Sequence, residues 1–195
     1  MRWFPAGEGQ TPLDRDEARG LRFDVNTRGE LDELEQINIV EALLWAGRRG
    51  GADLDLLSPS GLCRLHQRMF GDVWSWAGSF RSTEKNIGVA PHQVPGELKK
   101  ACDDMAWWIG EGAWEPRAAA ARYHHRLVRI HPFVKGNGRH ARIVADLFLA
   151  ARGAAPLSWP EDRALYIGAL RQADARRYGP LEELLLRGGP APISR

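Results

Sequence analysis

The chain has 195 residues, of which 44% are hydrophobic, and a formal net charge of +2. This length is typical of one domain and allows a full hydrophobic core. Basic and acidic residues are interspersed, which argues against the dense basic face of a specific nucleic-acid-binding protein. No apolar run is long enough to cross a bilayer and the N-terminus has no signal-peptide pattern, so we expect a cytoplasmic protein without a membrane partner. Cys63 and Cys102 lack metal-ligand spacing and are expected to be reduced core thiols.

Hydrophobic periodicity and cap signals predict an all-α fold, a compact helical bundle with one small β-hairpin. Residues 1–29 are rich in Gly, Pro and charge and are expected to form an irregular N-terminal arm. Residues 30–187 are predicted to form a single helical domain, and 188–195 a frayed tail. The predicted helices cover 30–48, 58–70, 94–109, 116–130 and 138–152, and two more begin near 159 and 180. The predicted hairpin lies within 82–91.

The first predicted helix carries a broad apolar stripe. Its members are Leu31, Leu34, Ile37, Ile39, Val40, Leu43 and Leu44. Such a stripe, and a second one on 98–108, either forms the core or packs against another copy of the chain. The sequence leaves both possibilities, and hence the oligomeric state, open.

The segment HPFVKGNGRHAR, from His131 to Arg142, combines a titratable base with a Gly-Asn-Gly turn. Pro132 disfavours helical geometry at His131, so we expect an extended His131 on a loop at the exit of a helix. Gly136 and Gly138 allow positive φ angles and close approach to a ligand. Their backbone amides, together with the N-terminus of the following helix, predict an anion site.

Two arginines follow this turn on one face of the predicted helix. Arg139 lies in the first turn, where a cation is unfavourable against the helix dipole unless an anion lies between them. Arg142 follows one turn later. Two guanidinium groups and a nest of amides suit a triphosphate better than a single carboxylate. A neutral His131 would then accept a proton from an attacking hydroxyl, and Phe133 is expected to anchor the loop in the core.

Simpler interpretations of the same residues remain open. A histidine before proline is often only a helix-end residue, and a GxG turn alone is a weak signal. The four histidines at 124, 125, 131 and 140 match no familiar metal spacing, so no metal site is predicted from them. The turn is not a P-loop, because no Lys-Ser/Thr pair follows the glycine.

The segment closely resembles the signature of the Fic family: His-Pro-Phe, any residue, an acidic residue, Gly-Asn-Gly-Arg, two variable residues and Arg. Eight of its nine defining positions are met. Residues 70–81 resemble the aromatic segment before the family's target-docking hairpin, called the flap, and 85–92 fall where the flap belongs. The N-terminal runs 11–13 and 27–36 resemble the subgroup called mobile mystery protein B. The resemblance spans roughly residues 11 to 187 and implies a Fic-type helical bundle.

The resemblance implies transfer of AMP from ATP to a Ser, Thr or Tyr hydroxyl of a target protein, with Mg²⁺. It makes His131 the general base and has Asn137 and the amides of Gly136 and Gly138 hold the phosphates. Arg139 would bind the outer phosphates, with Arg142 assisting at the γ-phosphate. The flap residues Lys85, Asn86, Ile87, Gly88 and Val89 would pair with an extended target segment by β-augmentation.

Lys135 departs from this pattern, because the family has its metal-binding acidic residue there. A lysine repels a cation and cannot ligate it while protonated. Three outcomes follow: Lys135 contacts the phosphates and replaces the metal's charge, Mg²⁺ binds through phosphates and water alone, or the site binds a nucleotide without turning it over. We favour altered or residual transfer, because the base and both arginines remain.

Many Fic proteins restrain themselves with a helical glutamate in a motif of Ser/Thr, three residues, Glu, then Gly or Asn. This chain has no clean copy. Glu35 lies in the nearest position, with Leu31 where the hydroxyl residue belongs. The sequence permits Glu35 to reach Arg142 and block the γ-phosphate, or to be an ordinary solvated charge. Without such a restraint, an antitoxin-like partner, as in toxin–antitoxin pairs, would be the expected regulator.

Two other functions compete with AMP transfer. Doc-type relatives turn ATP around and transfer its γ-phosphoryl group, but their motif has lysine at the position of Gly138, which argues against that activity here. The other alternative is a catalytically silent module that binds a nucleotide or a partner. Lys135 supports it, whereas the intact set of His131, Arg139 and Arg142 argues against it.

Overall fold

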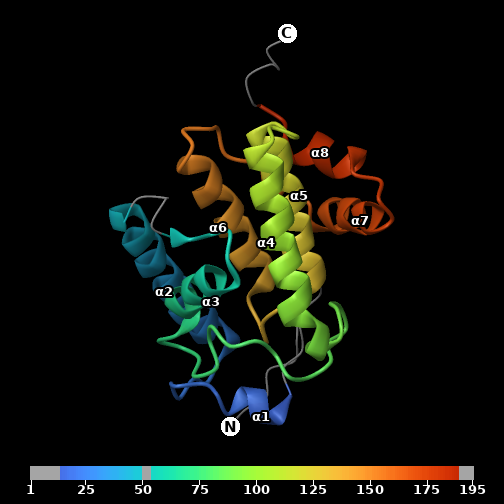
Figure 1. Ribbon diagram of the computed structural model, residues 1–195. Coiled ribbons are helices and arrows are strands. Elements are labelled where there is room, and N and C mark those ends of the chain that lie inside the picture. Colours follow the sequence, from blue (N-terminus) through green and yellow to red (C-terminus); the bar gives the residue numbers. More distant parts are fainter. Residues whose placement is uncertain (1–13, 50–53, 189–195) are drawn as a thin grey trace.

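The computed structural model describes residues 14–49 and 54–188, so most of the predicted arm (1–13) and tail (189–195) lie outside the described residues. The fold is all-α, as predicted (Figure 1). None of the described helices is long and apolar enough to cross a membrane. The helices are α1 (Arg15–Ala18), α2 (Arg28–Arg49), α3 (Pro59–Phe70), the 3₁₀ turn η2 (Pro91–Gln93), α4 (Val94–Gly110), α5 (Pro116–Ile130), α6 (Asn137–Ala150), α7 (Arg163–Asp174) and α8 (Gly179–Leu185).

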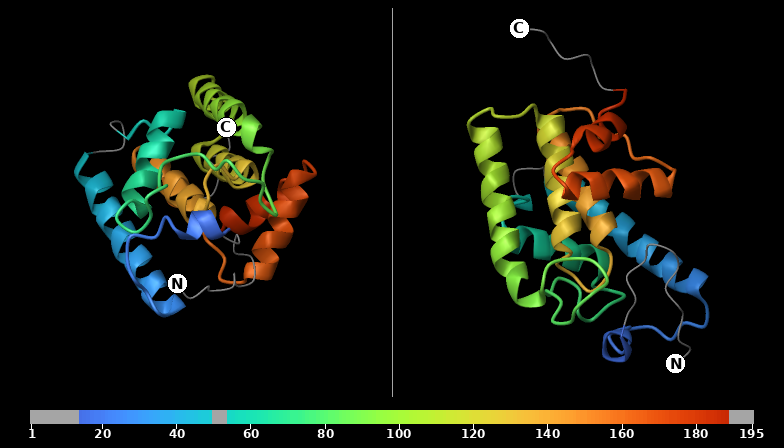
Figure 2. Two further views of the ribbon diagram at one scale, coloured as in Figure 1. Left: turned by 90° about the horizontal axis from the view of Figure 1, so that it is seen from below. Right: turned by 90° about the vertical axis from the view of Figure 1, so that its right-hand side faces the viewer.

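Helix α5 forms the centre of the bundle and packs against α4, α6, α7 and α8. Helices α2 and α3 pack together on one flank, and α7 and α8 pack together on the opposite flank (Figure 2). The motif loop connects α5 to α6 and so lies between the two flanks (Figure 1).

Local cap signals account for where several helices begin. The Ser58 side chain accepts a hydrogen bond from the backbone N–H of Gly61 at 3.0 Å, and Pro59 occupies the first turn of α3. Pro116 likewise opens α5. Asp162 caps α7 by accepting from the N–H of Leu165 at 3.0 Å. The predicted starts of these helices are therefore correct to within a few residues.

Helix α2 buries a different face from the one its apolar stripe suggests. Leu31 and Ile39 point inward, but Ile37, Val40 and Leu44 are exposed, at 58, 46 and 58%. Polar residues take part of the inner face: Asn38 is buried and donates to the carbonyl of Arg68 and to Asp72, while the Asp72 N–H donates back to it. Leu43 is also exposed, so four of the seven residues of the stripe are not core.

The predicted hairpin flap is absent. Residues 82–90 form no strand, and Leu21 pairs with Trp74 in the one isolated β-bridge of the described ranges. The guanidinium of Arg81 donates to the carbonyls of Thr83 and Val89, and the N–H of Val89 donates to the Ile130 carbonyl. Because these groups are already hydrogen-bonded to partners outside a cross-strand ladder, the segment keeps an irregular path.

Both cysteines are free thiols, as expected. Burial raises the pKa of Cys63 to about 11 and also raises the pKa of Cys102. Neither thiol is therefore a reactive thiolate at neutral pH.

Several histidines are buried in a neutral state. Burial lowers the pKa of His124 to about 3 and the pKa values of His131 and His140 to about 4, and it lowers the pKa of His66 well below its usual value. The folded protein therefore binds fewer protons than the unfolded chain at mildly acidic pH.

We expect the free energy of unfolding to fall as pH decreases from 7 to 5. When the pKa of a histidine is lower in the folded than in the unfolded state, its contribution to stability is fully present at pH values above the unfolded pKa, near 6.5. This contribution is lost as the pH falls toward the folded pKa. His124, His131 and His140 should each cost roughly 2 kcal/mol at pH 5. Urea denaturation at pH 7, 6 and 5 measures the loss. Carboxylates remain largely ionised above pH 5, so a flat profile in this window would contradict the neutral, buried histidines.

Candidate active site

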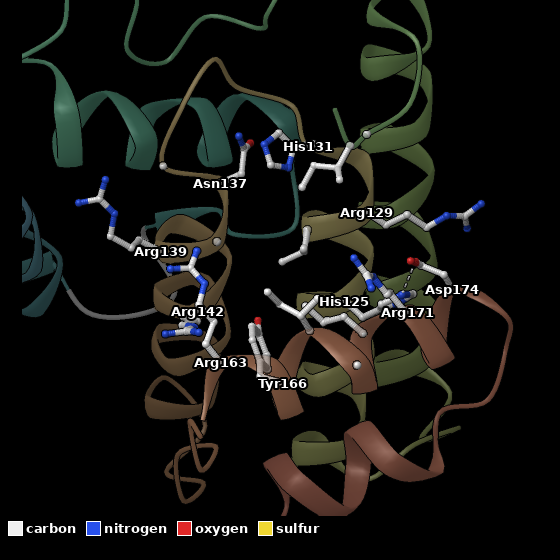
Figure 3. Close-up of a pocket in the computed structure, with 18 of the residues that line it drawn as sticks. His125, Arg129, His131, Asn137, Arg139, Arg142, Arg163, Tyr166, Arg171 and Asp174 are labelled. Atoms are coloured by element: carbon white, nitrogen blue, oxygen red, sulfur yellow. Dashed lines mark hydrogen bonds and ion pairs between the residues drawn. The ribbon is translucent and has the colours of Figure 1, made fainter. Parts of the chain in front are cut away.

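A cleft of about 1500 Å³ opens between the motif loop, the start of α6 and helix α7 (Figure 3). Every motif residue predicted to act as the base or to bind the phosphates lines it, as do Asn86, Ile87, Gly88 and Val89 of the flap segment. Lys85 and Glu35 do not belong to its lining. The motif residues in the lining are His131, Lys135, Gly136, Asn137, Gly138, Arg139 and Arg142.

His131 ends α5 in a left-handed conformation, with φ 54° and ψ 60°. The expected extended geometry is therefore wrong, although its position at a helix exit is correct. Arg81 stabilises this strained residue, because its Nε donates to the His131 carbonyl at 2.6 Å. Gly88 packs against His131 so closely that a Cβ would lie 2.8 Å from the His131 Cβ. Burial lowers the pKa of the imidazole to about 4, against a hydrogen bond to the Val128 backbone that raises it, so His131 is a neutral base at pH 7.

The motif loop is held by hydrogen bonds of its own. The Asn137 side chain accepts from the N–H of Phe133 at 2.9 Å and donates to the Phe133 carbonyl at 2.8 Å. Phe133 is fully buried, as expected of the anchor. The structure thus uses the Asn137 amide to close the loop, and its role toward phosphate stays a prediction.

Only one of the two motif glycines has a positive φ. Gly136 has φ 81°, and a Cβ there would come within 2.5 Å of the Phe70 ring. Gly138 instead lies in the first turn of α6, where an added Cβ would have no atom within 4 Å. The expectation of a positive φ at Gly138 is wrong, but its missing side chain leaves the helix N-terminus open to a ligand.

His66 of α3 fixes the motif loop through a hydrogen bond and a ring contact. The N–H of Gly78 donates to His66 Nδ1 at 2.9 Å, so the proton lies on Nε2, which donates to the Lys135 carbonyl at 3.0 Å. The imidazole also stacks on Phe133, with ring centroids 3.8 Å apart. No sequence signal announces this contact, because a lone histidine on a helix has no characteristic spacing.

Glu35 of α2 is completely buried and binds the motif directly. One carboxylate oxygen accepts from Lys135 Nζ at 2.5 Å and from the indole of Trp74 at 2.7 Å, and the other accepts from Arg139 at 2.5 Å. Burial alone would raise the pKa of Glu35, but the charges of Arg139 and Lys135 lower it. Glu35 is therefore not a solvated charge, and its partners in the motif are Lys135 and Arg139, whereas the contact with Arg142 that the sequence permits is not formed.

Arg142 is oriented by two aromatic rings on the other side of the cleft. Its guanidinium carbon lies 5.5 Å from the centre of the Trp159 ring and 4.8 Å from that of the Tyr166 ring. Figure 3 shows Arg142 beside Tyr166. Trp159 is itself fixed by donating to Asp146 at 2.8 Å. These rings come from α7 and the segment before it, so nothing in the motif announces them.

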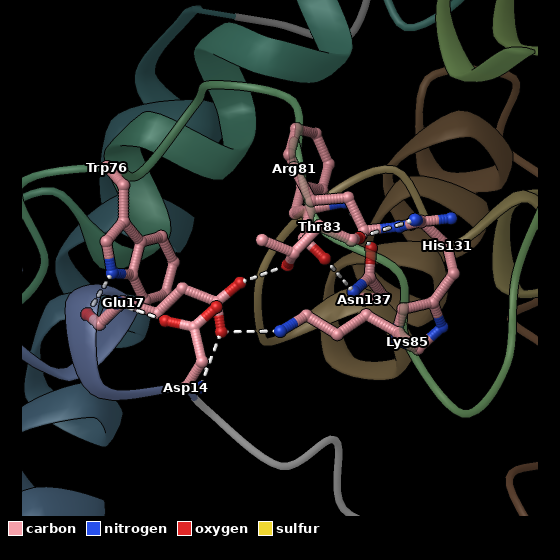
Figure 4. Close-up of polar contacts among 9 residues, drawn as sticks. Asp14, Glu17, Trp76, Arg81, Thr83, Lys85, His131 and Asn137 are labelled. Carbon is pink, nitrogen blue, oxygen red and sulfur yellow. Dashed lines mark hydrogen bonds and ion pairs between the residues drawn. The ribbon is translucent and has the colours of Figure 1, made fainter. Parts of the chain in front are cut away.

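The arm contacts the flap segment through Glu17 of α1 (Figure 4). Its carboxylate accepts from Lys85 Nζ at 2.5 Å and from the Thr83 hydroxyl at 2.7 Å, and its backbone carbonyl accepts from the Trp76 indole at 2.9 Å. The predicted arm thus contains one helical turn, which fixes the start of the flap. Lys85 points to the arm instead of lining the cleft.

Residues 56–149 match the Fic/DOC family. The chain belongs to this family. Among curated relatives, it is 31% identical over 150 residues to protein adenylyltransferase fic-1 of Caenorhabditis elegans, an alignment of 72% of this chain and 29% of that protein. It is 31% identical over 118 residues to protein adenylyltransferase Fic of Drosophila grimshawi, covering 58% of this chain and 24% of the relative. The chain thus spans less than a third of the length of these relatives.

The Fic fold is equally clear from a solved structure. The N-terminal Fic domain of Bep8 from Bartonella sp. 1-1C superimposes with a TM-score of 0.72, at 17% identity, over 88% of this chain and 90% of that one. This likeness concerns the fold alone. The mobile mystery protein B subgroup stays a prediction from the N-terminal sequence.

Replacing Glu35 with alanine should destabilise the unliganded Fic domain by about 2 kcal/mol, because Lys135 and Arg139 then face each other and the Trp74 indole loses its buried acceptor. The same change should increase the affinity for ATP, because Arg139 and Lys135 no longer have to break their ion pairs with Glu35 before they bind phosphate. Thermal melts with and without ATP measure both effects. Glu41→Ala, an exposed site on the same helix, is the control, and an equal ATP shift in both variants would contradict competition by Glu35.

Proposed function

We propose that the chain transfers AMP from ATP to a Ser, Thr or Tyr hydroxyl of a target protein. The observation that carries this proposal is a neutral His131 in a cleft that also contains Arg139, Arg142 and the open N-terminus of α6. Relatives at about 30% identity named protein adenylyltransferase support the same reaction.

The chemistry requires one proton acceptor and one anion site. The target hydroxyl oxygen forms a bond to the α-phosphorus of ATP while the bond from that phosphorus to the β-bridging oxygen breaks. The hydroxyl proton passes to His131, and pyrophosphate leaves. Arg142, Lys135, the α6 amides and Arg139, once Arg139 is released from Glu35, neutralise the charge on the phosphates.

A protein-bound Mg²⁺ does not fit the residues present. The motif position that would hold it is Lys135, whose ammonium binds Glu35, and Glu35 is shared with Arg139. The described residues contain no group of three or more His, Cys, Asp or Glu side chains suited to a metal. We therefore assign the charge-neutralising role at this position to the Lys135 ammonium.

Target docking and restraint complete the proposal. The flap residues 86–89 border the cleft near His131, which suits a target segment that lies along them. Glu35 holds Arg139 and so restrains the enzyme within the chain, which makes a separate antitoxin-like regulator a secondary expectation. ATP as donor and the free cysteines are consistent with action in the cytoplasm.

The deciding experiment is transfer of label from α-³²P-ATP to proteins of a bacterial lysate and to the chain itself. We expect labelling by the native chain and a loss of about 10²- to 10⁴-fold in His131→Ala, because the general base is removed. His92→Ala, at an exposed position, is the matched control.

The other donors and functions are separate outcomes of that experiment. Label from γ-³²P-ATP alone would replace AMP transfer with phosphoryl transfer. ATP binding by calorimetry without any label would identify the silent nucleotide-binding module. Labelling that survives in His131→Ala would contradict the assigned base.

Substitutions of Lys135 test its assigned role. We expect the native chain to transfer AMP in the presence of EDTA. Lys135→Met should lose this transfer activity, because methionine has a side chain of similar length but carries no charge. Lys135→Glu should become dependent on added Mg²⁺, since a carboxylate can ligate it. Native transfer that stops in EDTA and is unaffected by Lys135→Met would contradict charge replacement by lysine.

A further inference from the structure

The outward face of α2 carries a narrow seam of apolar residues bounded by opposite charges. Ile37, Val40 and Leu44 follow one another at spacings of three and four residues, and all are exposed. On a helix with 3.6 residues per turn, Glu33 extends the same stripe at its N-terminal end and Arg48 at its C-terminal end. In the described part of the chain α2 packs chiefly on α3 and lies at the edge of the bundle (Figures 1 and 2). The exposure of these three side chains shows that this face points away from the bundle.

The order of charges makes this seam complementary to itself. A two-fold axis through the midpoint between Val40 and Glu41 would bring Ile37 of one copy opposite Leu44 of the other. The same axis places Glu33 opposite Arg48, twice over, because the interface is isologous. A parallel arrangement would instead put like charges together. Gly47 lies beside the seam and has no atom within 4 Å of the place of a Cβ, which leaves room for close approach of a second helix.

We propose that two copies of this chain associate through α2, in antiparallel orientation, around the seam formed by Glu33, Ile37, Val40, Leu44 and Arg48. Burial of the three apolar side chains drives the association, and the two Glu33–Arg48 pairs set its direction. Leu43, which is 40% exposed, borders the seam and adds to its apolar area. Glu41 borders it on the other side and keeps its carboxylate in solvent.

The expected dimer is weak. A single helix pair buries less than the roughly 1,200 Å² at the low end of stable interfaces, so we expect a dissociation constant on the order of tens of micromolar. Sedimentation equilibrium of the full chain, over a concentration range that brackets this value, measures it directly. Ile37→Glu should abolish the dimer, because it places two carboxylates in the apolar seam.

A charge exchange distinguishes this geometry from any other dimer. Glu33→Arg and Arg48→Glu should each weaken self-association about tenfold, because every cross-pair becomes a like-charge pair. An equimolar mixture of the two variants should associate as the native chain does. In the mixed dimer, each of the two cross-pairs again joins an arginine with a glutamate. Lys100→Glu, a charge reversal on the exposed surface of α4, is the control for charge alone.

The possible results separate cleanly. Recovery in the mixture, with loss in Ile37→Glu, supports the antiparallel α2 dimer. A native chain that stays monomeric throughout the range overturns it, as does a dimer that survives Ile37→Glu or a mixture no stronger than its components. Circular dichroism melts of each variant ensure that a loss of association is not a loss of fold, which we do not expect at exposed positions.

Discussion

The buried carboxylate of Glu35 joins three parts of the molecule that are far apart in sequence. It lies on α2, accepts from Trp74 of the aromatic segment, and binds Lys135 and Arg139 of the motif loop. Burial of an unpaired carboxylate in this position would have a prohibitive desolvation free energy. The two cations and the indole are therefore required for α2 to pack in its observed orientation. Conversely, Lys135 and Arg139 can lie close to each other because the Glu35 carboxylate binds both of them. The orientation of α2 and the state of the anion site are therefore a single electrostatic arrangement.

The motif loop, in contrast, is held in place by hydrogen bonds within the chain. Asn137 closes it on the backbone of Phe133, His66 holds the Lys135 carbonyl, and Arg81 holds the carbonyl of the left-handed His131. Each of these contacts uses a side chain to satisfy a backbone group that no helix or strand pairs. A base whose position is fixed in this way loses little freedom when substrates bind, and burial keeps it neutral. In the reaction that we propose, His131 is therefore already in place as the proton acceptor, whereas Arg139 first has to leave Glu35.

The sequence predicts the helices well because their caps and periodicity are local, and it predicts the motif because its members are contiguous. It fails where long-range partners decide. Helix α2 has apolar residues on both sides, and partners far away in the sequence, namely the cations at 135 and 139, the Trp74 indole and the groups bound by Asn38, favour the orientation in which Glu35 and not Ile37 faces inward. The flap at 82–91 has β-like residues, but Arg81 occupies the carbonyls that a hairpin would need. The extended geometry expected of His131 follows from Pro132 alone, whereas Arg81 and the packing of Gly88 stabilise the left-handed one. Contacts from Trp74, Trp159 and Tyr166 have no local signature at all.

The two sides of helix α2 are proposed to take part in two different equilibria, nucleotide binding and dimer formation. Thermodynamic linkage couples these equilibria if both depend on the orientation of the helix. On its inner side Glu35 pairs with Arg139 and Lys135, so in the proposed reaction it would compete with the ATP phosphates for them. On its outer side the seam around Val40 offers a second copy of the chain a surface that exists only while α2 stays in its present orientation, since a rotation that exposes Glu35 also turns Ile37 and Leu44 inward. A partner that binds one orientation of the helix must disfavour any ligand that needs another, and the factor is the same in both directions. Dimer formation would therefore oppose nucleotide binding to whatever extent α2 has to move when Glu35 releases Arg139. If the carboxylate side chain can withdraw with the helix in place, the two equilibria are independent. Asn38, fixed by three hydrogen bonds to α3 and Asp72, favours that second case, because it anchors α2 one turn from Glu35 whichever partner Arg139 holds.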